Sequence, residues 1–481
     1  MFRPITFVFP ASAPAGDLDC GDSVAVLRDC RSVSFRDSGM PGEGPVLLDA
    51  AACCGLTPEA GAGLAELWVE YHPGLDPVTP ENLAAALARL ASSTPVILVT
   101  ADLDCARALL GSVPLACEAA GAGSSEAAGI LLDHARRALG PDCPPLILWG
   151  GVALPEAAAA FLATGVAGVV LEQAHWLLDA VGLPEAPAAR LRKLKYDACA
   201  TLAAGGRTQW RFFDKGNSRA VRRVRELAAA GDFAALSAEV RRSAVGLERS
   251  SLGADELIPF GADAPFAAGF AERFGKRADT ALRSFADETL RLWAEAPARL
   301  EQFRNGSAAA ELGVDLPLIQ GAMSWISDSP AFARAVAEAG ALPTLAVGSR
   351  SRADLERDFG GLAGIMGDKP YSVNVLVLDE NPRRAEQLQW LEAVQPPLVT
   401  VAAGEPSFAA GLRAKGMEVL YLAADVELLR LAVQAGVRFV VLEGCEAGGH
   451  VGRLTTLTLA QAALELRRHE PGLLRQARIV L

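Results

Sequence analysis

The amino-acid sequence predicts an α/β protein made of two parallel (β/α)8 barrels in tandem, the first degenerate and the second truncated at the chain end, joined by a helical segment. Short apolar runs alternate with alanine-rich helical stretches in two regions of the 481-residue chain, as in β/α units whose strands are buried on both faces. The run Cys445-Glu446-Ala447-Gly448-Gly449-His450 has a near copy at Cys117-Glu118-Ala119-Ala120-Gly121-Ala122, which indicates a duplicated unit. The predicted parts are residues 1–185, 186–312 and 313–481.

The composition favours well-buried globular domains. Hydrophobic residues make up 51% of the chain, and the net charge of −12 argues against general affinity for nucleic acid. Apolar runs fall short of the roughly 18 residues of a membrane span, so no contact with a membrane is expected. The nine cysteines lack Cys-x-x-Cys spacing. We therefore predict no metal site, and buried reduced thiols in a cytoplasmic protein.

The first unit is predicted to form a compact barrel. Stretches with helical spacing, for example Pro80–Ala91 and Ser125–Leu139, separate its apolar runs. Strands that alternate with helices pair in parallel, and a barrel of eight such units usually takes ~250 residues, so this one would be small. An open doubly wound sheet is the alternative. The expected strands are Ile5–Phe9, Val24–Leu27, Val46–Leu48, Leu67–Tyr71, Val96–Thr100, Leu115–Cys117, Leu146–Trp149 and Val166–Leu171.

The connector, residues 186–312, is predicted to be helical because strand-like runs vanish there. Eleven Lys or Arg residues lie between Arg190 and Arg225, against two acids. Such a cluster is usually a solvated helical face, and the alternative is a docking surface for an acidic carrier protein or a phosphate-bearing substrate. The expected helices are 217–230, 232–247, 266–275, 278–295 and 296–304.

The second unit begins at about residue 313, where the β/α alternation resumes. It offers six complete strands and the beginning of a seventh, too few for an eight-stranded barrel to close without unpaired edges. We therefore expect the chain to be the N-terminal part of a longer polypeptide. The expected strands are Leu316–Gln320, Pro343–Val347, Tyr371–Leu378, Leu398–Val401, Glu418–Leu422, Phe439–Glu443 and Arg478–Leu481. Helices are expected at Ala331–Ala339, Ala353–Gly360, Arg383–Ala393, Phe408–Lys415, Val426–Ala435 and Thr458–Arg468.

Candidate functional residues follow the carboxyl ends of these strands, where parallel barrels carry their active-site loops. Asn374 interrupts an apolar strand; when buried it needs a partner, either a ligand's ring edge or neighbouring backbone. The glycines Gly448 and Gly449 let backbone N–H groups approach a flat or anionic ligand. His450 titrates near neutral pH and could transfer a proton, or instead cap the helix near Thr458 or bond a carbonyl.

Three segments together, Pro317–Met323, Val373–Val375 and Glu446–Gly452, resemble the nitronate monooxygenase (2-nitropropane dioxygenase-like) family, which includes FMN-dependent enoyl-acyl carrier protein reductases. The resemblance implies a TIM-type flavin barrel with His450 as the catalytic proton donor or acceptor. The residues that it implies for FMN binding are Gln320, Gly321, Ala322, Met323, Asn374, Glu446, Gly448 and Gly449. The first unit, with Ala122 in the place of the histidine, is expected to be a decayed copy.

The segment Ala254–Ala267 resembles a connector of multidomain polyketide and polyunsaturated fatty acid synthases. The resemblances favour an FMN-dependent oxidoreductase that uses NAD(P)H to reduce an enoyl chain bound to acyl carrier protein or CoA. Further synthase domains of the same polypeptide are the expected partners, and a homodimer is the expected oligomer because large synthases of this kind are often dimers. A nitronate monooxygenase and a catalytically silent scaffold of a synthase are the alternatives, since fold alone does not decide between them.

Overall fold

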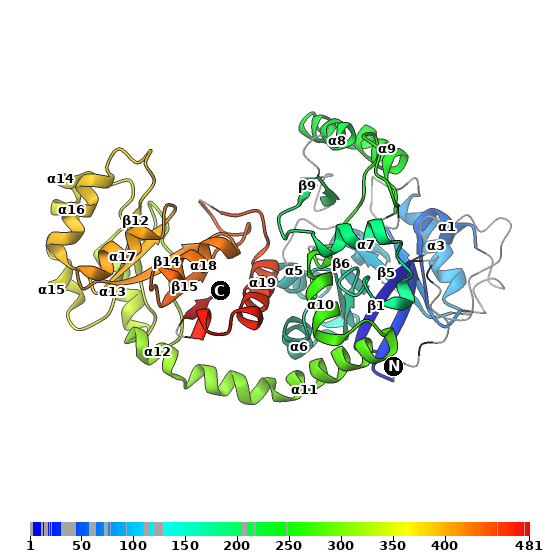
Figure 1. Cartoon of the computed structure of the whole chain (residues 1–481), viewed down its shortest axis with the longest axis horizontal. Coiled ribbons are helices and arrows are strands. Elements are labelled where there is room, and N and C mark those ends of the chain that lie inside the picture. The colour runs from blue at the N-terminus through cyan, green and yellow to red at the C-terminus, as the bar shows by residue number, and fades with distance from the viewer. Residues whose placement is uncertain are drawn as a thin grey trace. The chain divides into compact units, whose positions relative to one another are not determined.

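The computed structural model describes the chain except for residues 1–2, 11–12, 14–17, 19, 21, 30–44, 57–63, 72–75, 77, 93, 110–114, 119–127, 204–208, 215–217, 247–248, 450 and 476. The chain forms two compact units, Met1–Ala294 and Glu295–Leu481 (Figure 1). The finer division predicted above, with a separate connector, stays a prediction. Among the described residues, no helix combines the length and the apolar character needed to cross a bilayer.

The first unit contains a closed barrel of eight parallel strands. The ring closes where β1 pairs with β8, through Ile5 with Val169 and Phe7 with Leu171. The eight predicted strands of this unit are therefore confirmed, and the open sheet was the wrong alternative. The strands are β1 (Ile5–Pro10), β2 (Val24–Asp29), β3 (Val46–Asp49), β4 (Leu67–Glu70), β5 (Val96–Thr100), β6 (Leu115–Glu118), β7 (Leu146–Trp149) and β8 (Gly168–Leu171).

The interior of this barrel is packed with apolar side chains. Alternate residues of each strand point inward, and those of seven strands form one buried cluster in which the rings of Trp68 and Trp149 lie 5.8 Å apart. Two such large rings fill the space that a ligand would need in an eight-stranded barrel. The cluster comprises Val8, Leu27, Leu47, Trp68, Ile97, Val99, Ile147, Trp149 and Val170.

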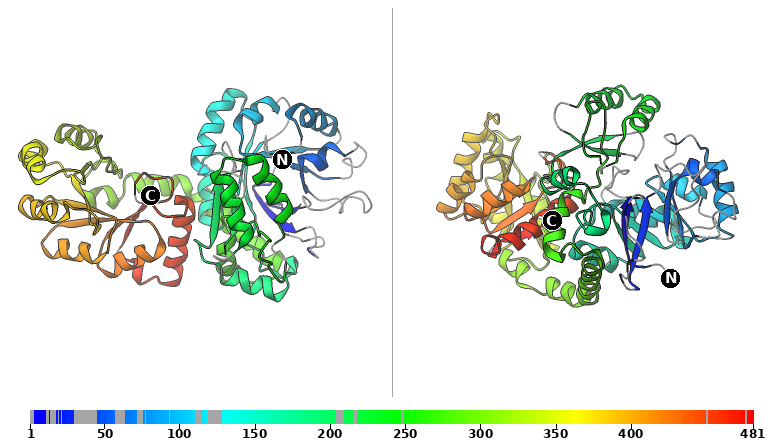
Figure 2. Two further views of the ribbon diagram at one scale, coloured as in Figure 1. Left: turned by 90° about the horizontal axis from the view of Figure 1, so that it is seen from above. Right: turned by 45° about the vertical axis from the view of Figure 1, so that its right-hand side comes forward.

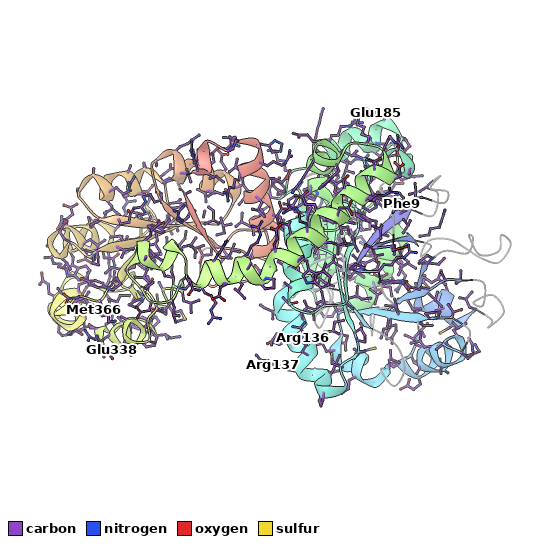
Figure 3. The ribbon with its side chains drawn as sticks, turned by 90° about the horizontal axis from the view of Figure 1, so that it is seen from below. Phe9, Arg136, Arg137, Glu185, Glu338 and Met366 are labelled. Atoms are coloured by element: carbon purple, nitrogen blue, oxygen red, sulfur yellow. The ribbon has the colours of Figure 1, made fainter. Side chains whose placement is uncertain are left out.

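The outer face of β1 packs against aromatic side chains of the same unit. Phe7 and Phe9, the latter labelled in Figure 3, lie 5.0 and 4.9 Å from the ring of His175. His175 is fully buried, and its Nε2 lies 2.9 Å from the main-chain oxygen of Val8. This histidine is therefore a packing residue that also makes a specific hydrogen bond.

Helices follow most of the barrel strands. Figure 3 labels Arg136 and Arg137 in the last turn of α5 (Ala128–Leu139). Arg136 donates to the main-chain oxygen of Thr164 (2.7 Å), so it ties α5 to the end of the next helix. The other helices of the barrel are α1 (Ala50–Cys54), α3 (Pro80–Leu90), α4 (Leu103–Leu109) and α6 (Pro155–Ala163), with the short 3₁₀ turns η1 (Gly140–Asp142) and η2 (Asp179–Val181).

A two-stranded antiparallel sheet lies in the region that we predicted to be entirely helical. β9 (Cys199–Ala203) pairs with β10 (Gln209–Phe213), and Phe212 of β10 packs into a buried cluster with Val221 and Leu236. The prediction of helices alone was wrong because strands of five residues are too short to show a clear two-residue period. Figures 1 and 2 show α8 (Arg219–Ala229) and α9 (Phe233–Ser243) beside this sheet.

Two helices that we predicted at 278–295 and 296–304 form a single helix, α11 (Ala278–Arg304). Pro297 lies within it. A proline removes one backbone hydrogen bond of a helix, but this helix continues through it. The remaining helices of this region are α7 (Glu185–Arg192), η3 (Ala264–Phe266), α10 (Ala267–Phe274) and α12 (Ser307–Leu312).

The second unit contains a six-stranded parallel sheet in the order of the sequence. The strands are β11 (Thr344–Ala346), β12 (Ser372–Leu376), β13 (Leu398–Ala402), β14 (Glu418–Ala423), β15 (Phe439–Leu442) and β16 (Arg478–Val480). These confirm six of the seven predicted strands. Closure of this sheet into a second barrel stays a prediction.

The first strand predicted for this unit, Leu316–Gln320, was wrong. Only a single parallel bridge, between Ile319 and Leu342, joins this segment to the sheet. Pro317 has no N–H to donate, and Leu316 and Leu318 are exposed rather than packed on both faces.

The helices of the second unit cover one face of its sheet (Figure 1). They are α13 (Pro330–Glu338), α14 (Arg352–Phe359), α15 (Leu362–Met366), α16 (Arg384–Val394), α17 (Ser407–Ala414), α18 (Val426–Gln434), α19 (Thr456–His469) and the 3₁₀ turn η4 (Leu473–Arg475). Figure 3 labels Glu338 and Met366 at one end of this unit. Arg334 of α13 joins this helix to α15, because it donates to Glu338 of α13 (2.7 Å) and to the main-chain oxygen of Met366 of α15 (2.8 Å).

One detail of the suspected repeat has the same geometry in both units. Asp102, just after β5, accepts a hydrogen bond from the N–H of Cys105 (2.7 Å). Asp425, just after β14, accepts one from the N–H of Leu428 (2.8 Å). Each aspartate thus caps the helix that follows the fifth strand of its predicted barrel. The duplication itself stays a prediction, since Ala119–Ala122 of the copied motif lie outside the described residues.

Candidate active site

The candidate site combines loops that follow the carboxyl ends of strands in the second sheet with the segment before β11 and with Asn374 of β12. In a parallel sheet these ends share one edge, which is where such sheets bind ligands. Asn374 contributes from β12, where it pairs in register with Ala346 of β11 and Thr400 of β13. Directly paired residues of neighbouring strands point to the same face. That face otherwise carries an apolar cluster that includes Leu398 and Leu420.

Asn374 is buried and makes a hydrogen bond within the sheet. Its Nδ2 donates to the main-chain oxygen of Thr400 (3.2 Å), and the side-chain oxygens of Thr400 and Ser372 lie 2.7 Å apart. The backbone partner that we weighed as the alternative is therefore present. It uses one of the two N–H donors of the amide, so the other donor and the acceptor Oδ1 are the groups that a ligand could use.

Gln320 holds the preceding segment along the free edge of β11. Its main-chain N–H donates to the oxygen of Leu342 (2.8 Å), and its Oε1 accepts a hydrogen bond from the N–H of Thr344 (3.1 Å). The side chain thus binds protein backbone at the start of the strand, while Gly321 and Met323 are exposed.

A tight turn follows at Met323. The N–H of Met323 donates to Oγ of Ser327 (2.8 Å), and the N–H of Ser327 donates back to the oxygen of Met323 (2.8 Å). Trp325 within the turn has a positive φ of 68° and is 76% exposed. A tryptophan in this conformation is uncommon. The turn therefore presents a large aromatic surface beside the carboxyl end of β11.

Arg350 lies on the loop after β11 and faces the same turn. Its guanidinium donates to Asp328 (2.6 Å) and to Asp358 (3.0 Å), and lies 6.0 Å from the ring centre of Trp325. Gln387 of α16, fully buried, fixes this loop because its Nε2 donates to the main-chain oxygens of Val347, Gly348 and Arg350 (3.0–3.1 Å). Gln387 could not be predicted as part of the site, since a single glutamine in a helix gives no signal of such a role.

The loop after β13 is held from the neighbouring strand. The hydroxyl of Tyr421 donates to the main-chain oxygen of Gly404 (2.6 Å). Burial raises the pKa of Tyr421 to about 12. This hydroxyl therefore remains a donor throughout the neutral range and keeps the loop in place.

Glu446 lies in the loop between β15 and α19, and its side chain contacts the backbone at the start of α19. Its two carboxylate oxygens accept hydrogen bonds from the N–H of Thr456 (3.0 and 2.9 Å), and Oε2 accepts another from the hydroxyl of Thr456 (3.1 Å). Gly444 makes this approach possible, because a Cβ there would lie 2.2 Å from the nitrogen of Thr456. The expected bond from Glu446 to FMN stays a prediction.

The backbone at Gly448 and Gly449 is open. Both residues are exposed, and a Cβ added to either would meet no heavy atom within 4 Å. Gly449 has a positive φ of 94°, which favours glycine. His450 lies outside the described residues, so its catalytic role stays a prediction.

The predicted site residues thus fall into three local groups. Gln320 to Met323 lie along the edge of β11, Asn374 lies on the sheet face between β11 and β13, and Glu446 to Gly449 lie before α19. Because most of these residues follow predicted strands in the sequence, we predicted that all three groups share one edge of the sheet. The expectation of buried thiols was wrong for Cys445, which is exposed next to the third group, and Cys54, Cys143 and Cys199 are only half-buried.

Residues 307–467 match the nitronate monooxygenase family model. This part of the chain is therefore nitronate monooxygenase-like. A nitronate monooxygenase of Paraburkholderia phytofirmans is 29% identical over 181 residues, which cover 29% of this chain and 48% of that protein.

A dehydrogenase of an octahydro-indene carboxyl-CoA from Rhodococcus jostii is 28% identical over 161 residues, covering 33% of this chain and 44% of that protein. Among solved structures, a FabK mutant from Thermotoga maritima is 30% identical with a TM-score of 0.30, covering 32% of this chain and 52% of that chain. The chain spans about half the length of the curated relatives that it matches.

Proposed function

We propose that the second unit carries the catalytic centre of an FMN-dependent oxidoreductase. The observation that carries this proposal is the match of residues 307–467 to the nitronate monooxygenase model, within a unit whose parallel strands end in exposed loops. FMN, when bound, supplies the hydride chemistry, and the protein supplies position and electrostatics.

The described residues fit a flavin at this edge of the sheet. The backbone at Gly321 and Met323 is exposed and offers a surface for a flat ring, and Gly448 and Gly449 offer N–H groups with open space around them. Asn374 retains one donor and one acceptor for a ring edge. Glu446 would bind FMN through the same carboxylate that accepts the hydrogen bond from Thr456.

The proposed reaction is the reduction of an enoyl chain linked to acyl carrier protein or CoA, with NAD(P)H as the reductant. His450 would deliver the proton to the carbon next to the thioester carbonyl, a task that suits an imidazole near neutral pH. The relative from Rhodococcus, named as a dehydrogenase of a carboxyl-CoA, supports a thioester substrate.

A second candidate is a nitronate monooxygenase activity, which the names of the family model and of the Paraburkholderia relative favour. His450 would then abstract the proton whose loss converts a nitroalkane into its nitronate, and molecular oxygen would be the oxidant. The two candidates differ in the co-substrate that they consume, so one pair of assays separates them.

The partner that we propose is an acidic acyl carrier protein, with further synthase domains of the same polypeptide and a homodimeric assembly. The basic stretch from Arg190 to Arg225 would supply the docking surface. Part of its charge is already paired, because Arg192 contacts Glu185 (2.8 Å), Arg219 contacts Asp255 (2.6 Å) and Arg225 contacts Asp214 (2.7 Å). Carrier docking would therefore depend on its remaining cations.

The test uses the full-length protein. We expect purified or FMN-reconstituted protein to be yellow and to oxidise NAD(P)H with crotonyl-CoA under anaerobic conditions. Oxygen uptake with a nitronate and no NAD(P)H oxidation would favour the monooxygenase. A folded protein that binds no FMN would contradict both activities and leave the scaffold as the function.

The matched variants are His450→Ala and His469→Ala. His469 lies at the exposed end of α19. We expect the first variant to lose most of the turnover while keeping its flavin, and the second to retain full activity. Equal activities of both variants would contradict the proposed role of His450.

A further inference from the structure

A buried segment of the chain covers the carboxyl end of β8 in the first unit. Residues 257–260 extend the small sheet of the same unit, where the N–H of Phe213 donates to the oxygen of Ile258 (2.9 Å). The following residues up to Ala267 reach the turn after β8, and the N–H of Gly261 donates to Oε1 of Gln173 (2.9 Å). Most of this segment is inaccessible to solvent. We call residues 257–267 the strap.

The strap places one carboxylate oxygen in a ring of three amides. Oδ2 of Asp263 accepts hydrogen bonds from the consecutive N–H groups of Glu172 (2.8 Å), Gln173 (2.8 Å) and Ala174 (3.0 Å). Successive backbone N–H groups that converge on one point form a binding site for an oxyanion. In parallel barrels the loop after the eighth strand is a common position for a bound phosphate.

The second oxygen of Asp263 points to another carboxyl group. A Cβ added to Gly261 would lie 2.6 Å from Oδ1 of Asp263 and 2.4 Å from Oε2 of Glu172, so both oxygens converge beside this glycine. The other oxygen of Glu172 accepts a hydrogen bond from Nε1 of Trp149 (2.9 Å), one of the two rings that fill the barrel.

Asp263 is wholly inaccessible to solvent. Burial raises its pKa, while the N–H bonds of the three amides oppose that rise. A buried carboxyl group is costly unless hydrogen bonds satisfy it. The three amides satisfy Oδ2 of Asp263, whereas its Oδ1 is buried without a hydrogen-bond partner among the described residues.

We propose that the amides of Glu172, Gln173 and Ala174 form an oxyanion site in the first unit, and that the carboxylate of Asp263 occupies it as an internal substitute for a phosphate. The strap then closes this end of the barrel to phosphate-bearing ligands such as mononucleotides. The turn after β8 thereby binds the strap, a segment of the predicted connector, in place of a ligand. This inference is independent of the function proposed for the second unit.

The test is the response of Asp263→Ala to inorganic phosphate in the full-length protein, measured against chloride at equal ionic strength. We expect the variant to unfold at a lower temperature than the wild type, and phosphate at millimolar concentration to restore part of the loss. Tryptophan fluorescence should change on the same titration, since Trp149 contacts Glu172. The wild type should not respond, because its site is filled.

Two further variants sharpen the result. Asp263→Asn keeps one oxygen for the amides and should fold without gaining a phosphate response. Asp104→Ala removes an exposed aspartate of α4 and should behave as the wild type. Slower exchange of the wild-type amides of residues 172–174 on adding phosphate, or a folded Asp263→Ala protein without a phosphate response, would overturn the proposal.

If Asp263→Ala does not fold, hydrogen exchange of the wild type tests whether Asp263 fills the oxyanion site. The amides of residues 172–174 should exchange at least about tenfold more slowly than unprotected amides, because each is bonded to a buried carboxylate. Exchange at the unprotected rate, or a rate that phosphate slows further, would show that Asp263 does not fill the site.

Discussion

The carboxylate of Glu446 binds the main-chain N–H of Thr456, at 3.0 and 2.9 Å, in the first turn of α19. This contact closes a loop of ten residues that begins just after β15. An anion at a helix N-terminus is stabilised by the unpaired N–H groups and by the helix dipole. The loop that carries the predicted flavin contacts is therefore anchored at both ends by regular structure.

The variant Glu446→Gln tests this anchor. We expect its unfolding temperature to fall by about 2–4 °C, because the amide is neutral and weakens the contact with α19. Thermal unfolding followed by circular dichroism measures this. Glu380→Gln, which changes an exposed glutamate of another loop, is the matched control. An unchanged unfolding temperature for Glu446→Gln would mean that the contact contributes nothing.

Two glycines of the same loop should respond differently to alanine. Gly444→Ala would force a Cβ to within 2.2 Å of the nitrogen of Thr456 and should destabilise the unit by about 2 kcal/mol. Gly448→Ala meets open space and should leave stability unchanged. If Gly448 faces the flavin, this second variant should bind FMN more weakly, which a fluorescence titration measures. Equal stabilities of the two variants would contradict the geometry of the loop.

Asn374→Ala should lower both stability and FMN affinity. It removes the bond to the oxygen of Thr400, which is worth about 1 kcal/mol. Ser372→Ala is the control, because Ser372 contacts the same threonine but lies nearer the amino end of β12. We expect the control to bind FMN as the wild type does. Normal FMN affinity of Asn374→Ala would remove this residue from the site.

We expect the stability of the first unit to depend on pH because of His175. Burial lowers its pKa from the ordinary value of 6.5 to about 3. Because the folded pKa lies below the unfolded one, the unfolded chain takes up the proton first. The contribution of His175 to stability is complete above about pH 6.5 and is lost as the pH falls toward 3.

Unfolding temperatures measured from pH 7 to 4 check this prediction. His175→Gln should show a shallower loss than the wild type over this range, whereas His469→Gln on the exposed end of α19 should follow the wild type. Parallel curves for the wild type and His175→Gln would contradict the assignment.

The barrel of the first unit and most of the second sheet could be predicted from the sequence because their strands are short continuous apolar runs. Val96–Thr100, for example, is buried at every position, so it gives an unambiguous signal. Leu316–Gln320 gives nearly the same signal but makes one bridge only. Pro317, which has no N–H to donate, distinguishes the second segment in the sequence. The exposure of Leu316 and Leu318 depends on neighbours in space, about which an apolar run carries no information.

The position of the candidate site could be predicted from the sequence, but the contacts of its residues could not. Asn374 stood out because a polar residue interrupts an apolar strand, but its bond to Thr400 depends on the register between β12 and β13. Gln387 and Asp263 gave no signal, because their partners lie far away in the chain. Such contacts between distant segments require the folded structure.

The bond between Asp263 and the N–H of Glu172 spans 91 positions of the chain. During synthesis, all eight strands leave the ribosome before the residue that caps the turn after the last of them. Contacts so distant in sequence form late and slow the folding of a domain. A fragment that stops at residue 185 would leave the N–H groups of residues 172–174 without the carboxylate of Asp263. The shortest fragment of the first unit that folds on its own therefore has to include the strap.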